Sequence, residues 1–219
     1  VPINAEGGKR VDQQMAIAEN FEERGDPAAW PPEAGDRQAL ANAALQAHSA
    51  LQWLARLANS YLPAGPGDSH LELSWRPERG AIGTQEFAGH TSVELRLPQF
   101  FLHFRELGKP TLHPVILDDK SPAEVEAWCL IELLHRGIDR DRFSKDLPYD
   151  IAGLLKGDAD HFETYEREGA FESLAAWLRS SSEILSEALG RAGAGGGPPK
   201  VVPQDFSLIA PVEGGCGAV

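Results

Sequence analysis

Residues 70–75 read His-Leu-Glu-Leu-Ser-Trp, and residues 91–97 read Thr-Ser-Val-Glu-Leu-Arg-Leu. Apolar and polar side chains alternate in both stretches, and this period of two is typical of a β-strand with one face in a core. A weaker strand is predicted between them, at 81–87. Short turns such as residues 77–80 join antiparallel neighbours. These stretches therefore predict an antiparallel meander sheet with one apolar face and one polar, solvent-exposed face.

Further strands are predicted later in the chain. Residues 99–104 and 111–117 are apolar enough to add to the sheet. Pro110 and Pro114 cannot donate backbone hydrogen bonds, so we expect these two segments at its edges or in irregular stretches. A last strand is predicted at 205–212.

Helical periodicity marks three segments. Apolar residues recur every three or four positions across 37–61, and Asp36 suits the N-cap of this helix. At 121–136, the opening Ser-Pro-Ala-Glu has the pattern of a capping box with proline at the first helical position. A third helix is predicted at 170–189. Together these elements predict an α+β fold, with an antiparallel meander sheet and the helices packed on one face.

The chain divides by composition. Residues 1–35 are polar and turn-rich, which predicts an N-terminal arm. Residues 36–189 form the α+β domain. The Gly- and Pro-rich residues 190–199 are typical of a linker. Residues 200–219 would supply the terminal strand and a flexible tail of the same domain.

Charge and cysteine content exclude several classes of function. The 219 residues carry 33 acidic against 20 basic side chains, a net charge of −13. Such a field repels nucleic acid and anionic lipid surfaces, so we expect neither as a partner. The two cysteines, Cys129 and Cys216, fit no metal or redox motif and favour a reducing, cytoplasmic location. No stretch approaches the ~18–20 apolar residues that span a bilayer.

Polar residues on the predicted sheet suggest a binding site. His70 and Glu72 would share one face of their strand, and Ser92, Glu94 and Arg96 would lie on the same face of its neighbour. A histidine, carboxylates and an arginine on one surface can bind a polar ligand or exchange protons. The same alternation is also what any half-exposed sheet shows.

The second set of candidates lies in the long connection at 138–168. It contains Leu-Pro-Tyr-Asp at 147–150, and long connections in compact domains often carry function. Tyr149 and Asp150 offer an aromatic ring, a hydroxyl and a carboxylate. The leading hypothesis is therefore a small polar ligand bound between the polar sheet face and this connection by His70, Glu72, Tyr149 and Asp150.

Two alternatives stay open. One is a hydrolase that uses histidine–carboxylate chemistry, with or without a metal ion. The sequence has no HExxH or similar motif, so no metal and no cofactor is predicted, although His103 and His113 would converge if their strands paired. The other is a structural or partner-binding protein without a pocket. A homo-oligomer is compatible with all three hypotheses.

Three stretches together resemble an uncharacterised bacterial protein family. They are the His-led segment 70–82 with its Trp75 and Pro77, the Leu-Pro-Tyr-Asp of 147–150, and Pro-Gln-Asp-Phe at 203–206. The last is similar to a Trp-Pro-x-x-Phe-Asp motif of that family, with valine and serine here in place of its Trp and Asp. Order and spacing agree over roughly residues 36–210. The resemblance implies a helix-plus-antiparallel-sheet fold and implies no activity.

Overall fold

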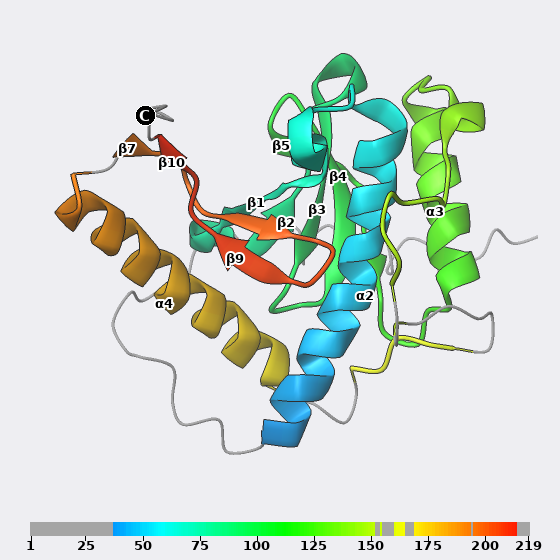
Figure 1. Cartoon of the computed structure of the whole chain (residues 1–219). Helices are drawn as coiled ribbons and strands as arrows, with labels where there is room; N and C mark the ends of the chain where they lie inside the picture. The colour runs from blue at the N-terminus through cyan, green and yellow to red at the C-terminus, as the bar shows by residue number, and fades with distance from the viewer. Residues whose placement is uncertain (1–36, 152–153, 155–159, 165–168, 194, 214–219) are drawn as a thin grey trace, which may run out of the picture.

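The computed structural model of the chain describes residues 37–151, 154, 160–164, 169–193 and 195–213, and Figure 1 shows their arrangement. Long helices in this part of the chain are α2 (Arg37–Tyr61), α3 (Pro122–His135) and α4 (Ala170–Arg191). Short 3-10 helices are η1 (Pro66–Leu71), η2 (Pro77–Arg79), η3 (Ala88–His90) and η4 (Arg140–Arg142). The strands are β1 (Leu73–Arg76), β2 (Ala81–Gly83), β3 (Thr91–Arg96), β4 (Phe101–Glu106), β5 (Lys109–Pro110), β6 (Val115–Ile116), β7 (Gly195–Gly196), β8 (Lys200–Val202), β9 (Ser207–Ile209) and β10 (Val212–Glu213).

The predicted fold class is confirmed. Eight of these strands form one antiparallel sheet in the order β5-β4-β3-β2-β1-β8-β9, and β6 pairs with β4 as well. Strands β1 to β5 follow one another as a meander, and β8 joins the other side of β1 after the chain has formed α3 and α4. Of the two segments expected at the edges, 111–117 does lie there, where its residues 115–116 pair with β4 as β6. The expectation is wrong for 99–104, because this segment forms β4, which lies inside the sheet between β3 on one side and β5 and β6 on the other.

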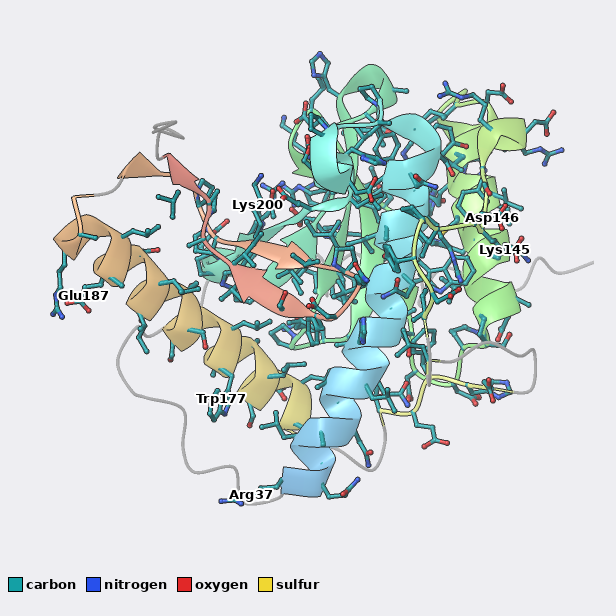
Figure 2. The ribbon with its side chains drawn as sticks, in the orientation of Figure 1. Arg37, Lys145, Asp146, Trp177, Glu187 and Lys200 are labelled. Carbon is teal, nitrogen blue, oxygen red and sulfur yellow. The ribbon has the colours of Figure 1, made fainter. Side chains whose placement is uncertain are left out.

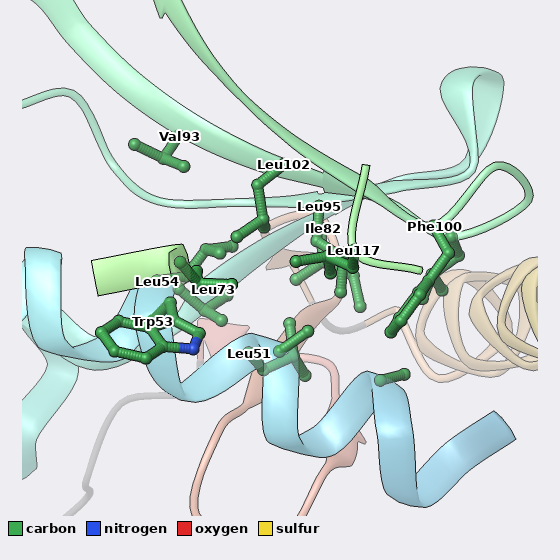
Figure 3. Close-up of a cluster of buried hydrophobic side chains, with 14 of the residues drawn as sticks. Leu51, Trp53, Leu54, Leu73, Ile82, Val93, Leu95, Phe100, Leu102 and Leu117 are labelled. Atoms are coloured by element: carbon green, nitrogen blue, oxygen red, sulfur yellow. The ribbon is translucent and has the colours of Figure 1, made fainter. Parts of the chain in front are cut away.

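One face of the sheet and the helices enclose the core. Figure 3 shows Leu51 and Leu54 of α2 beside Leu73, Ile82 and Leu95 of the sheet, and all five side chains are inaccessible to solvent. Burying each such side chain contributes roughly 1.5–3 kcal/mol. This shared core fixes α2 across the sheet, as Figure 1 shows.

The other two helices pack through aromatic contacts. Trp128 of α3 lies against Phe104 of β4, with ring centroids 5.3 Å apart. Phe171 of α4 stacks on Phe100 at 4.1 Å. Both sheet-side rings belong to the same core as the α2 leucines, so all three helices cover one face of the sheet.

Local signals set the ends of α3. Ser121 accepts a hydrogen bond from the Glu124 amide at 3.3 Å, and the Glu124 carboxylate accepts one from the Ser121 amide at 2.9 Å. This is the predicted capping box, with Pro122 at the first helical position. The helix ends at His135, and Gly137 follows the C-cap residue Arg136 with a left-handed φ of 65° that suits glycine.

The first strand is shorter than predicted. The structure begins β1 at Leu73, and His70 lies in η1 instead. The cause is the backbone after Pro66. Gly67 and Asp68 both have left-handed φ values near 57°, and the short helical turns of η1 continue from there to Leu71, so that His70 is not extended. His70 and Glu72 therefore do not share a strand face with Glu94.

The region after α4 also differs from the prediction. The helix extends to Arg191, and Gly195–Gly196 pair with Val212–Glu213, within the stretch predicted as a linker. Strand β8 at 200–202 was not predicted separately from the final strand. The predicted arm 1–35, the Asp36 cap and the end of the tail lie outside the described residues.

The prediction that the polar face of the sheet is solvent-exposed is wrong. Every residue of β3 is buried, and Glu94 in its centre is wholly inaccessible to solvent. A buried carboxylate is stable only with compensating partners, and these are described below. Among the described residues, no helix is long and apolar enough to cross a membrane.

Candidate functional site

Tyr149 and Asp150 line a hollow of about 450 Å³, which we call the Tyr149 hollow. Its walls come from α2, the first turns of α3 and the segment 145–151. Figure 2 shows Lys145 and Asp146 of this segment beside α3. The remaining lining residues are Trp53, Arg56, Pro122, Ala123, Glu126, Leu147 and Ile151.

Side chains on one face of α2 hold the segment in place. Arg56 Nε donates to the Lys145 carbonyl at 3.2 Å, and Asn59 Nδ2 donates to the Asp146 carbonyl at 3.0 Å. The Tyr149 hydroxyl donates to Gln52 Oε1 at 3.0 Å. Burial raises the pKa of Tyr149 well above its ordinary value, so the hydroxyl stays protonated as a donor. The wall of the hollow is therefore pre-formed.

The hollow contains charges of both signs. Lys145 Nζ pairs with Glu126 at 2.9 Å, and the Arg56 guanidinium lies 4.5 Å from the centre of the Trp53 ring. Asp150 is exposed. A ligand with separated positive and negative groups can pair with both kinds of side chain.

His70 and Glu72 do not line this hollow. The His70 ring is buried, with Nδ1 accepting from the Gly65 amide at 3.3 Å and Nε2 lying 3.3 Å from Asn59 Oδ1. These contacts fit a neutral ring that carries its proton on Nε2. Glu72 pairs with Lys200 of β8 at 2.6 Å. The structure thus brings together only Tyr149 and Asp150 of the four predicted site residues.

A second cluster surrounds Glu94 on the polar sheet face. Arg76 Nε and Arg79 Nη2 both lie 3.0 Å from Glu94 Oε1. His103 Nε2 lies 3.2 Å and Arg105 Nη1 3.5 Å from Glu94 Oε2. These cations and the imidazole explain how a carboxylate can be buried in a sheet.

The surroundings of Glu94 also set its charge. Burial would raise the pKa of Glu94, but the hydrogen bond from His103 and the charges of Arg105 and Arg79 outweigh it and lower the pKa to about 2. Burial lowers the pKa of His103 despite the opposing effect of Glu94. At neutral pH the cluster holds an ionised carboxylate and a neutral imidazole.

Gly83 makes room for this cluster. It pairs with Glu94 in the β2–β3 register. A Cβ at this position would lie 3.0 Å from Glu94 Cγ and 3.3 Å from the Val93 carbonyl oxygen, closer than side chains normally pack. The glycine therefore lets Glu94 and Arg76 meet across the strands.

A third cluster brings together two histidines and a carboxylate. His113, Glu132 and His135 each offer one ligand atom, and these atoms lie within 4.8 Å of one another. His113 precedes β6, whereas Glu132 and His135 lie one turn apart on α3. His103 faces Glu94 instead, so the predicted convergence of His103 and His113 does not occur.

Sequence reasoning missed the residues that α2 and α3 contribute to these sites. Trp53, Arg56 and Glu126 were counted only as helical residues, because nothing local distinguishes a helix position that faces a hollow. The spacing of Glu132 and His135 was a usable signal, since residues at i and i+3 meet on a helix. Comparison of the chain with protein-family models, curated proteins and solved structures found no match.

Proposed function

We propose that the protein binds a small zwitterionic molecule in the Tyr149 hollow. The observation that carries this proposal is the mixed lining: two aromatic rings, two cations and three carboxylates surround a volume of about 450 Å³. Small-molecule sites usually enclose about 300–1,000 Å³ and contain a few convergent polar groups. A ligand of amino-acid size fits this volume and presents both charges.

The anchoring of the segment 145–151 supports the proposal. Its backbone carbonyls are fixed by α2 side chains, and its tyrosine is fixed by Gln52. A site that is already ordered loses little conformational entropy when a ligand binds. The polar face of the sheet contributes nothing to the lining, so the proposed pocket differs in position from the one expected from sequence.

Asp150 and Lys145 are the side chains we assign to the two ends of the ligand. Both are exposed, and they offer charges of opposite sign. An ammonium group would pair with Asp150, and a carboxylate would pair with Lys145. The Trp53 and Tyr149 rings supply apolar surface between them.

Thermal unfolding with a panel of free amino acids and short peptides tests the proposal. A ligand present at 100 times its Kd stabilises the fold by about 2.7 kcal/mol, which raises Tm by roughly 5–10 °C in a chain of this size. Asp150→Ala should abolish the shift for the active compound. Asp141→Ala is the matched control, because Asp141 is also exposed and does not line the hollow. A panel in which no compound raises Tm would contradict the proposal. The hydrolase and partner-binding hypotheses stay predictions.

A further inference from the structure

The cluster of His113, Glu132 and His135, which we call the His–Glu–His triad, lies apart from the Tyr149 hollow. Its three members are not residues of that lining. Two of them come from the last turns of α3. The third, His113, is held by a hydrogen bond from Trp128 Nε1 of the same helix to its carbonyl oxygen at 2.9 Å. Helix α3 therefore positions all three residues.

The distances within the triad match a metal site better than a hydrogen-bonded one. His113 Nδ1 lies 3.6 Å and His135 Nδ1 lies 3.5 Å from the same oxygen, Glu132 Oε1. Both distances exceed those of ordinary nitrogen–oxygen hydrogen bonds. Ligand atoms about 2.1 Å from a tetrahedral Zn²⁺ ion lie roughly 3.4 Å from one another. The two nitrogens thus stand at about the separation from the carboxylate oxygen that a shared ion requires.

Arg136 orients the Glu132 carboxylate from the side away from the two histidines. Its other oxygen, Glu132 Oε2, accepts from Arg136 Nη1 at 2.8 Å. Arg136 is fixed in turn by Glu106 at 2.8 Å and by the Phe104 ring, whose centre lies 4.4 Å from the guanidinium carbon. Outer partners of this kind hold a ligand in the geometry that a metal needs. Glu132 Oε1 is left directed at the two imidazoles.

Burial is graded across the triad. The Glu132 side chain is 2% exposed, whereas those of His113 and His135 are 65% and 55% exposed. Both histidines also border a groove of about 700 Å³ whose apolar lining includes Leu107 and Leu112. An ion at the triad would be held from the protein side and open toward the groove.

We propose that the triad binds a Zn²⁺ ion through His113 Nδ1, Glu132 Oε1 and His135 Nδ1. Imidazole and carboxylate ligands suit this ion, and three protein ligands leave the fourth position of its tetrahedron for water or another small molecule. The binding is independent of the zwitterion proposed for the Tyr149 hollow. It also gives a physical basis to the metal-assisted alternative, since a Zn²⁺-bound water ionises near neutral pH.

Isothermal titration of the chelator-treated full chain with ZnCl₂ tests the proposal. We expect one ion per chain, with the affinity lowered at least about tenfold in His113→Ala and in His135→Ala. His90→Ala is the matched control, because His90 is an exposed histidine 3.0 Å from the carboxylate of Glu86. Within the part of the chain that the structure describes, these two residues belong to no group of three potential metal ligands. This control should bind Zn²⁺ as the unmodified chain does.

Both histidine substitutions remove largely exposed side chains, so the variants should fold, and circular dichroism checks this. Glu132→Gln adds a test of the carboxylate: it should also weaken binding if it folds, and the histidine variants decide the question if it does not. Absence of stoichiometric binding, or equal weakening in His90→Ala, would overturn the proposal and leave the triad as ion pairs between histidines and Glu132.

Discussion

The hydroxyl of Tyr149 donates a hydrogen bond to Gln52 Oε1 at 3.0 Å, which links positions 97 residues apart in the chain. Gln52 is 2% exposed. Its Nε2 also donates to the Pro203 carbonyl at 2.8 Å. One amide of α2 therefore joins the segment that lines the Tyr149 hollow to the turn between β8 and β9.

Removing the Gln52 amide should destabilise the fold. Gln52→Ala leaves the Tyr149 hydroxyl without its partner in a partly buried site, and we expect a loss of about 2–3 kcal/mol. Tyr149→Phe removes one hydrogen bond and should cost about 1 kcal/mol. Urea unfolding of both variants and of the double variant measures their coupling, expected near 1 kcal/mol.

The control for Gln52 is Gln85→Ala. Gln85 is exposed, and its Nε2 donates to the Ser69 carbonyl at 3.1 Å. Its replacement should change the free energy of unfolding by no more than about 0.5 kcal/mol. Strictly additive effects of the Gln52 and Tyr149 changes would show that the hydrogen bond does not stabilise the fold.

The capping box of α3 gives a second prediction. Ser121→Ala removes the oxygen that accepts from the Glu124 amide, and such losses typically cost about 1 kcal/mol. Denaturant unfolding measures the change. Ser186→Ala in α4 is the control, since its hydroxyl donates to the Ser182 carbonyl of the same helix and caps no helix end. We expect an effect within about 0.5 kcal/mol there, and equal effects at the two serines would argue against a capping role.

These examples show which parts of the fold local sequence encodes. The bounds of α2 and the start of α3 were predicted correctly, because periodicity and a capping box are signals within a few residues. His70 was misplaced because its alternation with Leu71 and Glu72 looks like a strand, whereas the left-handed turn at Gly67 controls the backbone. Strand β8 has only three residues, and its pairing with β1 is a long-range event.

The candidate sites depend even more on tertiary structure. The Leu-Pro-Tyr-Asp segment was recognised because it interrupts a long connection, but its neighbours Trp53 and Arg56 come from a helix almost a hundred residues earlier. Glu94 was recognised as polar, but its burial follows from Arg76, Arg79 and Arg105 arriving from other elements. Local sequence patterns do not predict such contacts between side chains from elements far apart in the chain.

Cys129 provides a third prediction. It is fully buried in α3, and burial raises the pKa of its thiol well above the ordinary value. Because the thiolate is the reactive form, Cys129 should resist thiol reagents in the native protein and react when the protein unfolds. Labelling a Cys216→Ser variant with a chromogenic disulfide, with and without urea, measures this.

A Ser186→Cys, Cys216→Ser variant is the positive control for labelling. Position 186 is exposed on α4, so its thiol should react at once in native buffer. Immediate reaction of Cys129 in the Cys216→Ser protein without urea would contradict the burial of α3 against the core.

The Glu94 cluster should govern stability in acid. The pKa of Glu94 falls from about 4.5 in the unfolded chain to about 2 in the fold, so its contribution is complete above pH 4.5 and is lost as pH falls from 4.5 toward 2. The shift corresponds to about 3 kcal/mol.

Glu94→Gln should therefore be less stable at neutral pH by about that amount and lack most of the acid dependence in this window. Urea unfolding from pH 7 to pH 2 measures both effects. Glu183→Gln on the exposed face of α4 should retain the full dependence, and a Glu94→Gln curve parallel to the unmodified protein's would show that another group causes the acid loss.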